Sequence, residues 1–256
     1  MHVPEKWLDF FDKDMLPLSE FERFLFDHMI PRDRKGIAQK GHQIMTERPF
    51  YHGGMVELQE KAGGRRVAEF LATNVRHRAF TEEDKAFVEA AGFFLIATSF
   101  NDVPDCSFKG GNPGFVKVTG ESTLEFPDYD GNLMFRTLGN IIKNPNVALL
   151  FIAIGANPKR LRINGQATIV REPERLSKHT GAQAVIEVLC LDLFPNCPRY
   201  IPDPCAGTQS IYNPRESVTA PVPAWKTFPG IAPLLPDGDS QREQINAMQK
   251  RDETLS

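Results

Sequence analysis

The spacing of hydrophobic and polar residues changes its period near residue 92. Before this point, residues 55–75 carry apolar side chains at helical spacing, interrupted by Gly63 and Gly64. The segment 81–92 begins with Thr81 and three acidic residues and ends in a glycine, which is typical of a capped helix. Residues 93–100 then form a mostly apolar run that is typical of a buried strand. The pattern predicts helices followed by a β domain.

The second half of the chain is a series of short strand patterns. Residues 105–110 alternate, so that Asp105, Ser107 and Lys109 share one face and Cys106 and Phe108 the other. One helical pattern interrupts the strands, at residues 132–144, and Pro145 ends it. Six or seven strands with a helix between the fourth and fifth predict an antiparallel barrel. The other predicted elements are strands at 93–100, 114–119, 122–128, 147–154, 160–170 and 184–194 and a short helix at 173–180.

These patterns divide the chain into three predicted parts. Residues 1–80 are an N-terminal helical extension that starts with one or two amphipathic helices before residue 49. Residues 81–202 are the barrel domain. Residues 203–256 are rich in proline and glycine and lose hydrophobic periodicity, which predicts an extended, partly disordered tail or one that wraps a partner subunit.

Composition narrows the function classes. The chain has 256 residues and a formal net charge of −3, which argues against a general nucleic-acid binder. It lacks the apolar run of about 18 residues that a membrane helix needs, and its N-terminus lacks the layout of a secretory signal. Four cysteines do not make a disulfide scaffold, and no close Cys or His pair indicates a metal site. We expect a cytoplasmic protein without a membrane partner.

The segment 104–118, PDCSFKGGNPGFVKV, is the first candidate for ligand chemistry. It lacks the Gly-Lys-Ser/Thr of a Walker loop, and it leads into a strand, whereas dinucleotide fingerprints lead into a helix. Two interpretations stay open. The segment is a wide hairpin connection, or Ser107 and Lys109 and its backbone amides approach a phosphate or a flat ring.

Two further polar patterns have the same two kinds of interpretation. In the predicted helix after Asn132, Arg136 and Asn140 share one face, as in a phosphate cradle or an ordinary solvated helix. Arg162, Asn164 and Gln166 alternate along the predicted strand 160–170, facing either a heterocycle or solvent. A serine-nucleophile motif is absent, and a Cys–His pair stays open because such partners need not be close in sequence.

The order of these motifs resembles the pyridoxamine 5′-phosphate oxidase-like, FMN-binding split-barrel family. The resemblance covers roughly residues 85–202 and runs through the sequences FFLIATS, PDCSFKGGNPGFVKV, LEFPDYDGN, TLGNIIKNPNVALLFI, LRINGQATI and FPNCPRYI. It implies a fold that is mainly β with helices, a six-stranded antiparallel split β-barrel. It also implies a homodimer with FMN in a cleft at the subunit interface.

The resemblance also implies which residues contact the cofactor. Many relatives carry Lys-x-x-Asn where this chain has Thr137 and Asn140, so Lys109 or Arg136 is expected to supply the missing positive charge. Ser107, Lys109 and Gly110 would line the flavin and its phosphate. The phosphate would be held by the turn and helix that contain Asn132, Arg136, Thr137 and Asn140, while Arg162 and Asn164 would approach the ring and Arg199 would reach the site from the C-terminal side.

The implied activity is that of an FMN-dependent oxidoreductase with a small-molecule substrate that the sequence does not identify. NADH or NADPH is a candidate reductant, and no metal is expected. Because the flavin carries the redox chemistry, no catalytic residue is assigned; Arg199 and Cys197 are candidates for proton transfer. The alternatives are a flavin-binding protein without turnover, a barrel that uses deazaflavin or haem, and an interaction barrel with an empty cleft.

Overall fold

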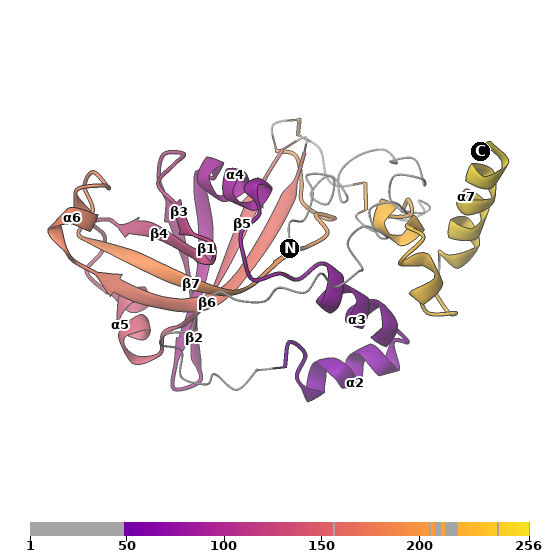
Figure 1. Cartoon of the computed structure of the whole chain (residues 1–256), viewed down its shortest axis with the longest axis horizontal. Helices are drawn as coiled ribbons and strands as arrows, with labels where there is room; N and C mark the ends of the chain where they lie inside the picture. The colour runs from indigo at the N-terminus through magenta and orange to yellow at the C-terminus, as the bar shows by residue number, and fades with distance from the viewer. Residues whose placement is uncertain are drawn as a thin grey trace, which may run out of the picture. The chain divides into compact units, whose positions relative to one another are not determined.

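A computed structural model describes residues 49–255 except residues 156, 205, 208–210, 213–219 and 240. The amphipathic helices predicted before residue 49 lie outside the described residues. The chain forms two compact units (Figure 1). The first contains Asn74–Pro221, and the second contains the described residues of Lys13–Thr73 and Val222–Ser256.

The first unit is built on a single antiparallel sheet with the order β2-β1-β5-β6-β7-β4-β3. The predicted class, mainly β with a split-barrel architecture, is confirmed. The family resemblance implies six strands, and the sheet has seven. The four-residue β3 is counted as a strand of its own, at the edge of the sheet beside β4. The strands are β1 (Phe93–Phe100), β2 (Val103–Gly110), β3 (Lys117–Gly120), β4 (Thr123–Asp128), β5 (Asn146–Ala153), β6 (Lys159–Val170) and β7 (Ala184–Pro195).

The sheet curves back on itself. Four strands separate β2 from β4 in the hydrogen-bonded order, yet the Lys109 Nζ of β2 lies 3.2 Å from the Asp128 Oδ1 of β4. The long strands β6 and β7 span the unit (Figure 1). The register of β6 against β7 shifts between Asn164 and Gly165. A Cβ atom at Gly165 would lie 2.4 Å from the Leu189 carbonyl oxygen, so glycine is required where the shifted strand approaches β7.

Phenylalanine side chains fill the centre of this curved sheet. The Phe94 ring lies with its centroid 4.9 Å from that of Phe126, edge to face, and 4.9 Å from that of Phe151, stacked. The Phe115 ring also stacks on Phe94, with the two ring centroids 5.9 Å apart. Such pairs add to the free energy gained from burying the rings. This apolar core fixes the strand ends that carry the polar residues of the site.

Three helices accompany the sheet. The helix α4 (Glu82–Ala90) begins as predicted, because the Thr81 and Asp84 side chains bond each other's backbone N–H groups in a capping box. The helix α5 (Arg136–Lys143) lies between β4 and β5 as predicted and packs on β1, β2 and β6. It begins four residues later than predicted. The short α6 (Pro173–Leu176) precedes β7.

The second unit is helical in its described part. The predicted break at Gly63 separates α2 (Gly53–Lys61) from α3 (Arg65–Asn74). The C-terminal segment contains the 3₁₀ helices η3 (Ala224–Thr227) and η4 (Ala232–Leu234) and the helix α7 (Arg242–Leu255). The prediction of an extended tail is therefore wrong for these residues. The polar run REQINAMQKRDETL has little hydrophobic content, but it contains good helix formers and no proline or glycine.

Candidate functional site

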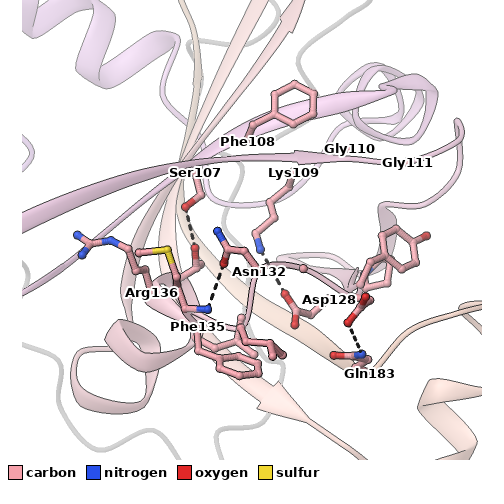
Figure 2. Close-up of a pocket in the computed structure, with 18 of the residues that line it drawn as sticks. Ser107, Phe108, Lys109, Gly110, Gly111, Asp128, Asn132, Phe135, Arg136 and Gln183 are labelled. Atoms are coloured by element: carbon pink, nitrogen blue, oxygen red, sulfur yellow. Dashed lines mark hydrogen bonds and ion pairs between the residues drawn. The ribbon is translucent and has the colours of Figure 1, made fainter.

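A cavity of about 750 Å³ opens beside the end of β2 in the first unit. Its walls are the second half of β2, the end of β4, the loop 129–135 and the first turn of α5 (Figure 2). Volumes of roughly 300–1,000 Å³ are usual for sites that bind small molecules and cofactors. The cavity therefore has room for a ligand of nucleotide size.

The polar face of β2 supplies one wall. Strand alternation directs Ser107 and Lys109 to the same side, as predicted, and both line the cavity. Figure 2 shows both side chains extending from β2 toward the loop that carries Asn132. The Lys109 ammonium donates to Asp128 at 3.2 Å, and Ser107 Oγ donates to Asp105 at 3.1 Å. The strand thus presents one cation and one hydroxyl to the cavity.

The first turn of α5 supplies the opposite wall. Leu133 and Phe135 have left-handed φ angles of 61° and 50°, which explains why the helix begins at Arg136. Asn132 Oδ1 accepts a hydrogen bond from the backbone N–H of Met134 and steadies this turn. The N-cap residue Phe135 offers no side-chain cap. The N–H groups of the first turn therefore receive no side-chain acceptor there, and the helix dipole adds partial positive charge beside the cavity.

A chain of hydrogen bonds ties the two walls together. Thr137 Oγ1 lies 2.9 Å from Ser107 Oγ, which donates to Asp105. The Arg136 Nε donates to the other oxygen of Asp105 at 2.7 Å. The hydrogen bond from Arg136, opposed by burial and assisted by Ser107, lowers the pKa of Asp105 below its usual value. Asp105 therefore stays ionised and orients Ser107 and Arg136.

Four exposed apolar residues belong to the lining of the cavity, and we call them its apolar mouth. Phe108, Leu133, Met134 and Phe135 all line it and remain 64%, 72%, 64% and 52% exposed. The Phe108 ring stacks on Phe93 with centroids 5.3 Å apart. Several large apolar residues exposed next to one another usually mark a surface that contacts a ligand or a partner.

The structure brings together six of the ten predicted site residues. Ser107, Lys109, Gly110, Asn132, Arg136 and Thr137 all line the cavity.

Asn140, Arg162, Asn164 and Arg199 do not line the cavity. Asn140 turns toward β1, where its amide donates to Thr98 Oγ1 at 3.0 Å. Arg162 and Asn164 alternate with the buried Leu161 and Ile163, which places them on the outer face of β6. A cofactor role for these four residues stays a prediction.

Sequence reasoning missed several residues of the cavity. Asp128 and Asp130 lie on its wall, and Gln183 donates to Asp130 at 3.2 Å. Both carboxylates occur in the sequence FPDYDGN, directly after a strand pattern, but nothing in that pattern shows that β4 folds back to face β2. With Lys109 and Arg136, the lining contains two cationic and two acidic side chains. Charge alone therefore does not select an anion here; donor geometry must do so.

Two kinds of feature are absent from the described part of the chain. Its His, Cys, Asp and Glu side chains form no group of three or more that could hold a metal ion. None of its helices has the length and apolar content needed to cross a membrane.

Comparison with known proteins finds a family match for part of the first unit. Residues 80–189, which contain every residue that lines the cavity, match the family described as pyridoxamine 5′-phosphate oxidase. The resemblance predicted from the sequence is therefore confirmed for this segment. No curated protein sequence gives a significant match to the chain.

Solved structures similar to the chain include three that cover about half of it. HupZ from Group A Streptococcus is 17% identical, with 45% of this chain and 93% of that chain covered and a TM-score of 0.37. The FAD binding protein from Mycobacterium smegmatis is 14% identical, with 47% and 97% covered and a TM-score of 0.35. A FAD-binding protein from Mesorhizobium loti is 14% identical, with 46% and 97% covered and a TM-score of 0.33.

Proposed function

We propose that the cavity binds FMN and that the protein is an FMN-dependent oxidoreductase acting on a small molecule. One observation carries the proposal: hydroxyl, ammonium and helix N-terminal donors meet at one cavity that also has an apolar mouth. The family match of residues 80–189 and the flavin named for two similar structures support a flavin as the ligand class. The choice of FMN within that class follows the family resemblance, and the donors described next fit its phosphate group.

The donor set fits a phosphate group. Lys109 contributes a charged donor, and Ser107 and Thr137 contribute hydroxyl groups 2.9 Å apart. The uncapped first turn of α5 adds backbone N–H groups, a common arrangement for phosphate binding. Arg136 lies at the edge, where Asp105 already engages it. The two carboxylates on the wall already have donors within the fold: Lys109 bonds Asp128, and the Gln183 amide bonds Asp130.

The apolar mouth fits a flat heterocycle. Phe135 offers a ring face, and Leu133 and Met134 offer aliphatic surface. A bound flavin would supply the hydride or electron transfer, and the protein would supply orientation and exclusion of water. Asn132 and Gly110 would shape the polar boundary between ring and phosphate. NADH or NADPH is the proposed reductant.

A homodimer is part of the proposal. The four apolar residues of the mouth are more than half exposed in the single chain, and a second subunit would cover what the flavin leaves open. The cytoplasmic location expected from the composition stays a prediction.

The first experiment is an absorbance spectrum of the purified protein, with mass identification of any released chromophore. Titration of the ligand-free protein with FMN and with riboflavin then isolates the phosphate. We expect FMN to bind at least about 10-fold more tightly, because riboflavin lacks the charged group that the donors would hold. Equal affinities would remove the phosphate assignment, and failure of both ligands to bind would remove the flavin.

Turnover needs a separate test. Reduction of the bound flavin by NADH or NADPH, followed by reoxidation by a small molecule, would support an oxidoreductase. A flavin that binds but is not reduced would favour the alternative of a flavin-binding protein without turnover. If the purified protein contains haem or a deazaflavin, that molecule, and not FMN, is the ligand of the cavity.

A further inference from the structure

Three arginines gather at the start of β6, on residues that do not line the cavity. Arg160 and Arg162 are two residues apart on β6 and so share its outer face.

The chain that leaves β7 passes beside Arg160, because the register pairs Leu161 with Pro195. The Asn196 N–H donates to the Arg160 carbonyl at 3.1 Å, and the Arg160 guanidinium donates to the Cys197 carbonyl. This connection brings Arg199 into the same neighbourhood. We call Arg160, Arg162 and Arg199 the arginine cluster.

The two arginines of β6 carry positive charge that no described carboxylate balances. Neither Arg160 nor Arg162 forms an ion pair with any described carboxylate. Burial lowers the pKa of Arg160, and repulsion from Arg162 and Arg199 lowers it further against an opposing effect of Cys197. Arg162 and Arg199 are thus each close enough to Arg160 to repel its guanidinium group. An arrangement of this kind is costly unless an anion joins it.

A buried donor in the cluster also lacks an acceptor. The Nε of Arg160 is buried and has no hydrogen-bond partner among the described residues. The carboxylate of Asp192, on the neighbouring strand β7, is already engaged by Arg76 at 2.5 Å. Buried donors in folded proteins are nearly always bonded to protein, water or a ligand. An acceptor from outside the chain would satisfy this one.

The backbone that presents Arg199 is held in an uncommon conformation. Tyr200 has a left-handed φ of 72°, and its ring lies 5.6 Å from the Arg199 guanidinium carbon. A bulky residue adopts such a φ only when its surroundings enforce it, and this kind of strain is frequent at ligand sites. The stacked ring restricts the guanidinium and reduces the entropy that a bound ligand would have to remove.

We propose that the arginine cluster is a second binding site, separate from the cavity, for the carboxylate or phosphate group of a small molecule. Planar guanidinium groups bind both kinds of oxyanion through paired N–H donors. This inference gives Arg162 and Arg199 a ligand other than the flavin that the family resemblance implies for them. It does not depend on the flavin proposal, because no cluster residue lines the cavity.

The test measures binding of inorganic phosphate and of succinate by calorimetry at constant ionic strength, with chloride as the balancing anion. The background is Lys109→Met, which removes the charged donor of the proposed phosphate site in the cavity, so that phosphate binding there does not mask the cluster. We expect this protein to bind at least one of the two anions. Arg162→Gln in the same background should weaken that binding by about 10-fold or more, because a charge-assisted contact is lost. Arg162 is exposed, so its replacement should leave folding intact.

Arg171→Gln is the matched control. Arg171 is an exposed arginine directly after the other end of β6, and its replacement removes the same charge. Anion affinity should remain unchanged in this variant. Equal losses of anion affinity in Arg162→Gln and Arg171→Gln would show an effect of general surface charge and overturn the inference. A background protein that binds neither anion would overturn it as well. Tighter binding of phosphate or of succinate identifies the class of ligand.

Two further measurements keep the outcomes separate. If Lys109→Met does not fold, the number of phosphate sites is counted in the unmodified chain and in Arg162→Gln, and the inference requires one site fewer in the variant. FMN affinity should be unchanged in Arg162→Gln. A loss of FMN affinity as large as the loss of anion affinity would show that Arg162 contacts the flavin, and it would overturn the inference. Failure of the chain to bind FMN would overturn the proposed function alone.

Discussion

The cavity around Lys109 and the closed charge cluster around Glu125 are built from the same kinds of side chain but differ in openness. Glu125 on β4 is 3% exposed in its side chain, and Arg175 and His179 bond its two oxygens, at 2.9 Å from the Arg175 Nε and 3.1 Å from the His179 Nε2. A second carboxylate, Glu187, accepts from Arg175 at 2.8 Å. Every charge in this cluster has a partner within the fold.

The cavity leaves donors available instead. Among the described residues, Lys109 has one carboxylate partner, at 3.2 Å, although an ammonium group has three donors. The first turn of α5 lacks a side-chain cap, and Arg136 remains half exposed. The comparison teaches that paired charges by themselves do not indicate a site. A site requires pairs with donors left over and room beside them, whereas a satisfied and buried set stabilises the sheet.

The largest expected effect is on the closed cluster. Glu125→Ala leaves the buried His179 without its described carboxylate and removes one of the two carboxylates of Arg175, so we expect the free energy of unfolding to fall by about 3 kcal/mol. Chemical denaturation measures this loss. Glu187→Ala is the control, since Glu187 is 38% exposed and bonds the same arginine; it should cost less than about 1 kcal/mol. FMN affinity should be unchanged in both variants, and a large loss in either would break the comparison.

The second effect is on the cavity. Lys109→Met removes the ammonium from the proposed phosphate site, and FMN affinity should fall by about 10- to 100-fold because a charge-assisted hydrogen bond is lost. Fluorescence titration of FMN measures the change. Lys143→Met removes an exposed lysine from the other end of α5 and should leave affinity unchanged. Similar affinities in the two variants would contradict the proposed position of the phosphate.

A smaller effect is expected at Asn140. Its side chain supports α5 from behind, through the hydrogen bond to the buried Thr98, and does not line the cavity. Asn140→Ala should lower the free energy of unfolding by about 1 kcal/mol and weaken FMN binding less than Lys109→Met does. Parallel denaturation and FMN titrations compare the two. An FMN loss as large as that of Lys109→Met would show direct contact and restore the role that the family resemblance implies.

The smallest effect concerns acid stability. Burial opposes the charge of Glu125, but hydrogen bonds from His179 and Arg175 outweigh it and lower the pKa of this carboxyl below its usual 4.5. A lowered folded-state pKa means that the stabilisation is present above pH 4.5 and is lost as the pH falls through the folded value. Denaturation between pH 6 and pH 3 should therefore show a weaker acid dependence in Glu125→Gln than in the unmodified chain. If the two proteins show the same acid dependence, groups other than Glu125 cause the loss of stability at low pH.

Much of this arrangement could be predicted from local sequence. The Thr81 cap, the polar face of β2 and the helix between β4 and β5 follow from residue types and spacing over a few positions. The start of α5 could not be predicted, because Leu133 and Phe135 give no local indication of left-handed φ angles. The Glu125 cluster was also missed, since Arg175 and His179 approach Glu125 only through the pairing of β4 with β7.

The site residues divide in the same way. Ser107 and Lys109 were found from strand alternation, and Asn132, Arg136 and Thr137 from a helix start and a family resemblance. Asp128 and the apolar mouth required the fold, because strand order and curvature decide which strand ends meet. The outward position of Arg162 depends on which face of β6 packs on the core, and an alternating polar pattern fits both faces of a barrel.

The contact between Lys109 and Asp128 also bears on how the chain folds. These residues belong to strands that four others separate in the sheet, so the contact cannot form until the whole sheet has paired and curved. Contacts between distant strands form slowly because loop closure comes first. We therefore expect the cavity to be assembled late, after β1, β5, β6 and β7 have joined. In a refolding time course, recovery of ligand binding would lag behind the burial of Phe94 and report the completion of the native state.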